Sequence, residues 1–433
     1  MTKKITYILL ASIGILVLLI DWYVFQGIKT LTTSAGMSAI VNTAYWVLFT
    51  GINILLFYFI LGIRGREIST WAKTFFHLYL TILVTKLSFV TIMLGEDVYR
   101  TLAFAYNYNS EGEQHLPLRS KLVSKIGIVL ASFPFAFFIY GISKGKYAYK
   151  VRKEVLYFDD LPEAFEGFTL TQISDIHAGS LDNPIAVKKG IELINAQNSD
   201  LFVFTGDIVN NEASELKPWI EIFKEIKAPY GKYSVLGNHD YGDYISWPSV
   251  EDKRTNLQNL KRFHKEIGFH LLLDNHVTIE KGGEKISLLG VENWGLGFGQ
   301  KGDLKKALLG VEKSSFKVLL SHDPTHWEEV VKKEEVPVHL TLSGHTHGMQ
   351  FGFELLGFKW SPVKYRYPHW AGMKKENGKH LYINRGFGFI GFSGRVGIWP
   401  EITVIEFRKK VIQKDSPLTK SQNKSIRSME INI

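Results

Sequence analysis

Metal-ligating side chains recur in five short segments between residues 175 and 347. The segments read SDIH, GD, GNHD, SHD and GHTH, and they supply Asp175, His177, Asp207, Asn238, His322, His345 and His347. Carboxylate, imidazole and amide-oxygen donors without sulfur suit Mn²⁺, Fe or Zn²⁺, because they are richer in nitrogen than Mg²⁺ or Ca²⁺ sites. Seven ligands exceed the needs of one tetrahedral ion and fit two ions that share a carboxylate and a water. These residue types therefore predict hydrolytic chemistry at a pair of divalent cations.

Each of these segments follows a short β-rich run, such as FTLTQIS before Asp175 or VHLTLSG before His345. In an extended chain, residues two apart point to the same side, so His345 and His347 are expected to offer two neighbouring groups. The glycines at 206, 237 and 344 are expected to turn the chain where a side chain would crowd an ion. Ligands of α/β sheets bind beyond the carboxyl ends of the strands. We therefore expect the five strand ends to converge on one crevice.

The elements that would position these residues begin near Lys150. From there, strand-like runs alternate with amphipathic stretches at 183–198 and 251–266, which is the pattern of a layered α/β domain. The chain has no cysteine, which excludes thiolate metal sites, disulfides and cysteine nucleophiles.

Four long apolar segments precede this domain, at 5–25, 41–63, 71–94 and 122–142. Each has about the 20 residues that a helix needs to cross a hydrocarbon layer of roughly 30 Å. A buried soluble bundle is the alternative, and the first segment alone could be a secretory signal. His77 and Lys86 lie within the third segment. They could mark a transport route, or His77 could lie at the interface while Lys86 reaches headgroups or a partner helix; we favour an anchor.

The formal charge of +9 is concentrated in the membrane part, because residues 1–150 carry 14 Lys and Arg against 6 Asp and Glu. The rest of the chain is close to neutral, which argues against a nucleic-acid partner. Basic residues flanking the apolar segments are more numerous on the side of the N-terminus than on the other side. The positive-inside rule therefore places both termini and the α/β domain in the cytoplasm.

The five motifs in this order resemble the calcineurin-like metallophosphoesterase superfamily over about residues 165–408. The stretches LPEAFEGFTLTQISDIHAGS and NRGFGFIGFSGRVGIWPEITVIEF look like its membrane-associated bacterial branch, which includes enzymes similar to UDP-2,3-diacylglucosamine hydrolases. The resemblance implies a four-layer α/β fold with two central mixed sheets. We therefore expect a transmembrane domain of four helices at 1–149, the metallophosphoesterase domain at 150–408, and a basic, disordered tail at 409–433.

The resemblance also implies roles for individual residues. Asp175, His177, Asp207 and His347 would hold one ion, and Asp207, Asn238, His322 and His345 the second. A hydroxide bridging the two ions would attack phosphorus, while His239 would protonate the departing oxygen. Among the metals suited to such a site we favour Mn²⁺, with Fe or Zn²⁺ as alternatives.

Several further residues have two interpretations each. Arg385 and Arg395 could bind the substrate phosphate or fix their glycine-rich loop. Asp240 could orient the imidazole of His239 or be an ordinary turn residue, and Asn210 or Asn211 could lie behind the site. The aromatic stretch at 353–372 could form a lip that dips into the membrane interface or could pack under the sheet.

These expectations combine into a phosphoesterase anchored in the inner (plasma) membrane that hydrolyses a phosphodiester or a pyrophosphate, with a lipid-linked substrate preferred. The alternatives are a tethered hydrolase of soluble phosphoesters and a catalytically inactive scaffold or receptor. We disfavour the scaffold because no ligand position is substituted. The sequence leaves the oligomeric state open.

Overall fold

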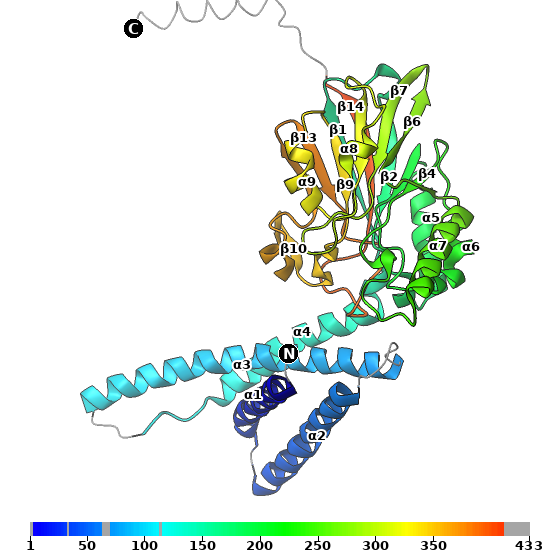
Figure 1. Cartoon of the computed structure of the whole chain (residues 1–433). Coiled ribbons are helices and arrows are strands. Elements are labelled where there is room, and N and C mark those ends of the chain that lie inside the picture. Colours follow the sequence, from blue (N-terminus) through cyan, green and yellow to red (C-terminus); the bar gives the residue numbers. More distant parts are fainter. Residues whose placement is uncertain (1–2, 33, 63–69, 112–114, 411–433) are drawn as a thin grey trace, which may run out of the picture.

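The computed structural model describes residues 3–32, 34–62, 70–111 and 115–410. Long helices form the N-terminal part, and a layered α/β domain follows them (Figure 1). The predicted disordered tail lies outside the described residues from residue 411 onward.

Among the described residues, four helices are long and apolar enough to cross a membrane. They are α1 (Lys3–Lys29), α2 (Ala35–Gly62), α3 (Thr70–Glu111) and α4 (Lys121–Ser143). α3 continues past Leu94, its predicted end, because the charged residues that follow have partners. Asp97 accepts a hydrogen bond from Arg100 (2.6 Å), and Glu96 accepts one from the backbone N–H of Ser120 (2.5 Å).

Inside the helical part, Lys86 of α3 forms an ion pair with Asp21 of α1. Asn53 of α2 donates a further hydrogen bond of 2.7 Å to the same carboxylate. The ammonium also lies 3.5 Å from the ring centroid of Phe49. Lys86 therefore binds a partner helix, as one of the two interpretations of this residue predicted.

The α/β domain contains two mixed six-stranded sheets, in the orders β1-β14-β2-β3-β4-β5 and β12-β13-β9-β8-β7-β6. The strands of the first sheet are β1 (Lys150–Phe158), β14 (Glu401–Lys409), β2 (Thr169–Ile173), β3 (Leu201–Phe204), β4 (Lys232–Ser234) and β5 (His270–Leu271). The strands of the second are β12 (Gly372–Glu376), β13 (Lys379–Ile383), β9 (Leu340–Ser343), β8 (Phe316–Leu320), β7 (Glu284–Gly290) and β6 (Asn275–Lys281). In each sheet, parallel central strands end at the same edge.

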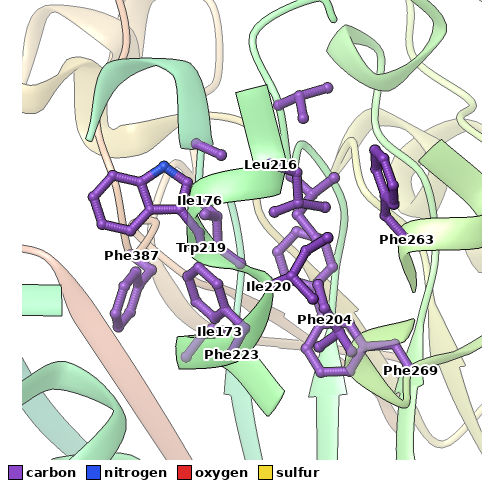
Figure 2. Close-up of a cluster of buried hydrophobic side chains, with 14 of the residues drawn as sticks. Ile173, Ile176, Phe204, Leu216, Trp219, Ile220, Phe223, Phe263, Phe269 and Phe387 are labelled. Carbon is purple, nitrogen blue, oxygen red and sulfur yellow. The ribbon is translucent and has the colours of Figure 1, made fainter. Parts of the chain in front are cut away.

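Alternating apolar side chains hold the layers together. Along β3, Leu201 and Val203 pack between the two sheets, while Phe202 and Phe204 face the helices on the outer side. Figure 2 shows Phe204 in this outer cluster. Burying one such phenylalanine fully contributes about 1.5–3 kcal/mol. The outer helices are α5 (Pro184–Asn195), α6 (Ile220–Lys224) and α7 (Val250–Ile267) on the first sheet, and α8 (Leu304–Ala307) and α9 (Thr325–Glu329) on the second. The four-layer fold is therefore confirmed.

The aromatic stretch forms a hairpin of β10 (Phe353–Leu355) and β11 (Phe358–Trp360), followed by a short helical turn. Trp370 is 2% exposed and packs against Tyr367 and Ile398, so this tryptophan belongs to a core and not to a membrane lip. The exposed apolar residues of the stretch are instead Leu356 and Phe358, at 90% and 77%.

The helical part packs directly onto the α/β domain through two glycines at the end of α4. A Cβ at Gly141 would lie 2.5 Å from the carbonyl oxygen of Arg395, and one at Gly145 would lie 2.6 Å from it. The backbone N–H of Arg395 donates a hydrogen bond of 3.2 Å to the carbonyl of Gly141. Only glycine permits this approach, so the spacing of these two glycines fixes the position of α4 on the domain.

Candidate metal centre

The seven predicted ligands come together at the carboxyl ends of five strands. Asp175 and His177 follow β2, Asp207 follows β3, Asn238 follows β4, His322 follows β8, and His345 and His347 follow β9. They lie at the edge where both sheets end, because strands β2, β3, β4 and strands β7, β8, β9 run parallel within their sheets.

Six of these residues form two groups, each able to offer ligand atoms within 4.8 Å of one another. The first group is Asp175, His177 and His347, and the second is Asp207, His322 and His345. In the first, His177 Nε2 lies 3.0 Å from His347 Nε2. In the second, His345 Nδ1 lies 3.3 Å from His322 Nε2. Imidazole nitrogens that converge in this way beside a carboxylate fit a divalent cation in each group.

Asp207 lies between the two groups. Its Oδ2 is 3.1 Å from His322 Nε2 in its own group and 3.7 Å from His177 Nε2 in the other. The amide oxygen of Asn238 lies 2.9 Å from His345 Nδ1, while its amide N–H₂ donates to the hydroxyl of Tyr244 (2.8 Å). Tyr244 thereby turns the amide oxygen of Asn238 toward the second group.

The backbone of five of the seven candidate ligands is left-handed, not extended. Positive φ angles occur at Asp175 (53°), His177 (48°), Asp207 (62°), His345 (70°) and His347 (49°). The premise that these segments are extended was therefore wrong, although His345 and His347 do offer neighbouring groups, one to each of the two ligand groups. Non-glycine residues in this region are strained, and such strain is typical of functional sites.

All three predicted glycines are required by close contacts, and a Cβ at Gly206, whose φ is 96°, would lie 2.6 Å from the backbone nitrogen of Gly237. A Cβ at Gly344 would lie 1.9 Å from Ser174 Oγ and 2.3 Å from Asp175 Oδ2, and one at Gly237 would lie 2.2 Å from Asp207 Oδ1. These carboxylates therefore pack against bare backbone.

His239 begins a short 3₁₀ turn, and its side chain is only partly buried. Its backbone N–H donates to Asp207 Oδ1 (2.8 Å), and its Nδ1–H donates to the carbonyl of Asn210 (2.8 Å). The ring of Tyr244 lies 4.5 Å from its ring, centroid to centroid. Because Nδ1 is occupied as a donor, Nε2 is the nitrogen that can gain or lose a proton.

Asp240 fixes the turn that carries Asp207. Its carboxylate accepts N–H bonds from Gly237 (2.9 Å), Asp207 (2.9 Å) and Ile208 (2.8 Å). The alternative in which Asp240 orients the imidazole of His239 is wrong, because Asn210 has that role through its backbone carbonyl. Burial, with repulsion from Asp207, raises the pKa of Asp240 to about 7.

The charges of the site support one another. Burial alone would raise the pKa of Asp207, but the attraction of His322 and His239 holds it well below its usual range. His347 and His322 lower the pKa of Asp175 against the effect of burial in the same way. Burial opposes protonation of His322, yet its attraction to Asp207 raises its pKa to about 10. Both carboxylates are therefore anionic at neutral pH.

The two arginines are occupied by the protein itself. Arg385 is ion-paired with Glu354 (2.5 Å) and Glu401 (2.5 Å). Arg395 is fully buried, and its Nη2 donates to the carbonyls of Arg385 (2.8 Å) and Gly388 (2.6 Å). It also lies 3.2 Å from His347 Nδ1. This geometry favours the loop-fixing interpretation over a phosphate contact.

The sequence reasoning missed two residues of the site. Tyr244 orients Asn238 and its ring contacts that of His239 at a tilt of 36°, and Asp323 Oδ2 lies 3.4 Å from His345 Nε2. Both could have been found from their closeness in sequence to the metal-ligand motifs, because Asp323 directly follows His322 and Tyr244 closely follows the GNHD segment.

The fold and the paired ligand groups define a metal-dependent phosphoester hydrolase. The family model "Probable Calcineurin-like phosphoesterase, transmembrane domain" matches residues 5–146, and the model "Calcineurin-like phosphoesterase" matches residues 168–349. The chain belongs to the calcineurin-like metallophosphoesterases, and it carries their four-helix transmembrane domain.

Relatives in bacteria and vertebrates carry the same domain. The chain is 31% identical over 251 residues to the uncharacterized metallophosphoesterase YkuE of Bacillus subtilis, which covers 57% of this chain and 82% of the relative. It is 27% identical over 363 residues to an uncharacterized metallophosphoesterase of Helicobacter pylori, which covers 82% and 89%. It is 26% identical over 283 residues to a "Transmembrane protein with metallophosphoesterase domain" of Danio rerio, which covers 63% and 60%. The protein is thus a membrane-associated enzyme of this family.

Proposed function

We propose that this enzyme binds two divalent cations and hydrolyses a phosphodiester or a pyrophosphate at the membrane. One ion would be held by Asp175, His177, Asp207 and His347, and the other by Asp207, Asn238, His322 and His345. The observation that carries the proposal is the position of Asp207, whose Oδ2 faces an imidazole nitrogen of each group at 3.7 and 3.1 Å.

A pair of divalent ions, when bound, supplies a hydroxide nucleophile near neutral pH and offsets the charge of the phosphate. We favour Mn²⁺ over Fe or Zn²⁺ because the donors mix carboxylate and amide oxygen with imidazole nitrogen. The chain contributes the fixed geometry. The backbone N–H of His345 donates to both oxygens of Asp175 (3.1 and 3.0 Å), which holds this carboxylate against the strand end that carries the second group.

His239 would act as the general acid. Its Nδ1–H is held by Asn210, so a proton carried on Nε2 can be passed to the departing oxygen. Its partial exposure leaves this nitrogen accessible to a substrate, unlike the buried imidazoles of His177 and His322.

The test uses the full chain in nanodiscs with Mn²⁺ and bis-p-nitrophenyl phosphate. Wild type is expected to turn over this diester. His239→Ala should lower kcat by about 10²–10⁴ with unchanged metal content, whereas Asp207→Asn should lose metal as well. His270→Ala, on the exposed strand β5, is the matched control. Full metal loading with no turnover by wild type would favour the inactive scaffold.

We further propose that the α/β domain faces the cytoplasm. Basic residues are concentrated at the ends of the predicted spans that lie on the same side as the N-terminus and this domain. A reporter fused after Ile433 tests this orientation. Activity of a reporter that works only outside the cytoplasm would contradict it.

A further inference from the structure

A cavity of about 530 Å³ joins the membrane helices to the metal centre. Its apolar lining comes from Leu80 and Val84 of α3, Phe138 of α4, and Phe351, Ile390 and Phe392 of the α/β domain. His345 and His347, one candidate ligand from each group, line the same cavity. A single space therefore touches both a membrane-spanning helix and the site of chemistry.

The walls of this cavity are held by specific contacts. The backbone N–H of Ser393 donates to His77 Nε2 of α3 (3.1 Å), and the ring of Phe392 lies 5.3 Å from that of His77. Phe138 of α4 contacts Phe392 at 5.7 Å and Phe351 at 5.6 Å between ring centroids. The cavity is thus a built feature of the junction, and His77 is a docking residue at the domain end of α3.

The chemistry of the lining selects the occupant. Leu80 and Val84 belong to the candidate membrane span Thr74–Asn109, so one end of the cavity is formed by a helix that is apolar enough to lie among lipid chains. Among the polar lining residues, Thr346 Oγ1 already donates to the carbonyl of Trp370 (2.7 Å) and Gln350 Nε2 to that of Phe392 (2.7 Å). The imidazoles of the metal centre are therefore the polar end of an otherwise apolar space.

We propose that the substrate is an amphiphilic phosphoester whose hydrocarbon chain occupies this cavity while its phosphoryl group lies at the metal centre. This inference rests on the proposed function for the position of the phosphoryl group. A chain that moves from the bilayer into the cavity exchanges one apolar surrounding for another, so it pays no desolvation penalty. A soluble phosphoester would leave the apolar walls in contact with water.

The surface beside the cavity has the same character. Met349, which lines the cavity, is 59% exposed, and the nearby hairpin exposes Leu355 (67%), Leu356 (90%) and Phe358 (77%). Figure 1 shows β10 at the end of the domain that is nearer to α3 and α4. An exposed apolar edge at this position fits contact with the lipid surface.

The test compares O-octyl and O-methyl p-nitrophenyl phosphate as substrates of the full chain in nanodiscs. Val84→Trp and Leu80→Trp fill the cavity, and Leu87→Trp is the matched control on the same helix, because Leu87 is 43% exposed and does not line the cavity. Each methylene that loses its apolar surroundings costs about four-fold. The octyl-to-methyl ratio of kcat/KM should therefore fall at least ten-fold in Val84→Trp and stay unchanged in Leu87→Trp. Leu80→Trp decides if Val84→Trp does not fold.

A second measurement does not depend on turnover. An octylphosphonate with a diazirine at the end of its chain is photolysed with wild type, and the labelled peptides are mapped. Label at residues 80–84 or 390–392 supports the inference, and label spread evenly along α3, Leu87 included, overturns it. An octyl-to-methyl ratio that is equal in all variants overturns it as well. If neither ester is hydrolysed, the proposed function fails, and the labelling alone decides whether the cavity binds the chain.

Discussion

Gly344→Ala is the substitution that most directly tests how the metal centre is built. The added Cβ would lie 2.3 Å from Asp175 Oδ2 and 1.9 Å from Ser174 Oγ. Ordinary contact begins at about 3.4 Å, so the carboxylate of Asp175 must move by about 1 Å. A displacement of that size costs about 10²-fold in a catalytic site, and overpacking adds about 1–3 kcal/mol of lost stability. Alanine adopts the backbone of Gly344 without strain, because its φ lies outside the left-handed region.

The assay measures three quantities in nanodiscs: the Mn²⁺ affinity by calorimetry, kcat/KM for bis-p-nitrophenyl phosphate, and the urea midpoint of the α/β domain by tryptophan fluorescence. Gly51→Ala is the control, because a Cβ there meets nothing within 4 Å. We expect Gly344→Ala to lose about 10²-fold in Mn²⁺ affinity and in kcat/KM. If it binds Mn²⁺ and turns over the diester like Gly51→Ala, Asp175 is not part of the metal centre.

Three further predictions concern the junction, the membrane part and pH. Gly141→Ala should lower the stability of the domain by about 1–3 kcal/mol relative to Gly51→Ala, because the new Cβ lies 2.5 Å from a loop carbonyl; equal urea midpoints would contradict this. Lys86→Met should cost about 3–5 kcal/mol by leaving the carboxylate of Asp21 unpaired, and adding Asp21→Asn should restore most of the thermal stability. Burial lowers the pKa of His264 to about 3, so the folded state favours the neutral imidazole. The free energy of unfolding should therefore fall as pH falls from about 6.5 toward 3. In His264→Gln, the free energy of unfolding from urea titrations should depend less on pH over that range, by about 1.4 kcal/mol per pH unit. An unchanged pH dependence would mean that another group causes the loss of stability.

The fold could be predicted, and the candidate ligands could be placed at strand ends, because their signals are local in the sequence. Each ligand directly follows an apolar run, and parallel strands bring those run ends to one edge, as Asp175 after β2 and His322 after β8 illustrate. The four apolar segments could be predicted equally well, since candidate membrane spans are recognised from length and composition alone.

Contacts between distant segments could not be predicted in this way. No periodicity encodes the left-handed backbone of His345 and His347 or the close packing of Gly344 against Ser174 and Asp175. The partner of Lys86 is Asp21, a single acidic residue in another apolar segment, and only the packing of α1 on α3 pairs them. The hydrogen bonds of the Arg395 guanidinium likewise depend on the carbonyls of Arg385 and Gly388, which lie near it only in the folded loop.

The junction of α4 with the domain bears on how this enzyme can be handled. In a fragment that begins at Lys150, the side chains of Phe351 and Phe392 would lose the cover of Phe138, and the carbonyl of Arg395 would lose the backbone of Gly141. Such a fragment would expose a new apolar patch beside the candidate metal ligands and would tend to self-associate. The helices therefore form part of the surroundings of the candidate metal centre, and a fragment that lacks them would not have the surface of the full-length protein.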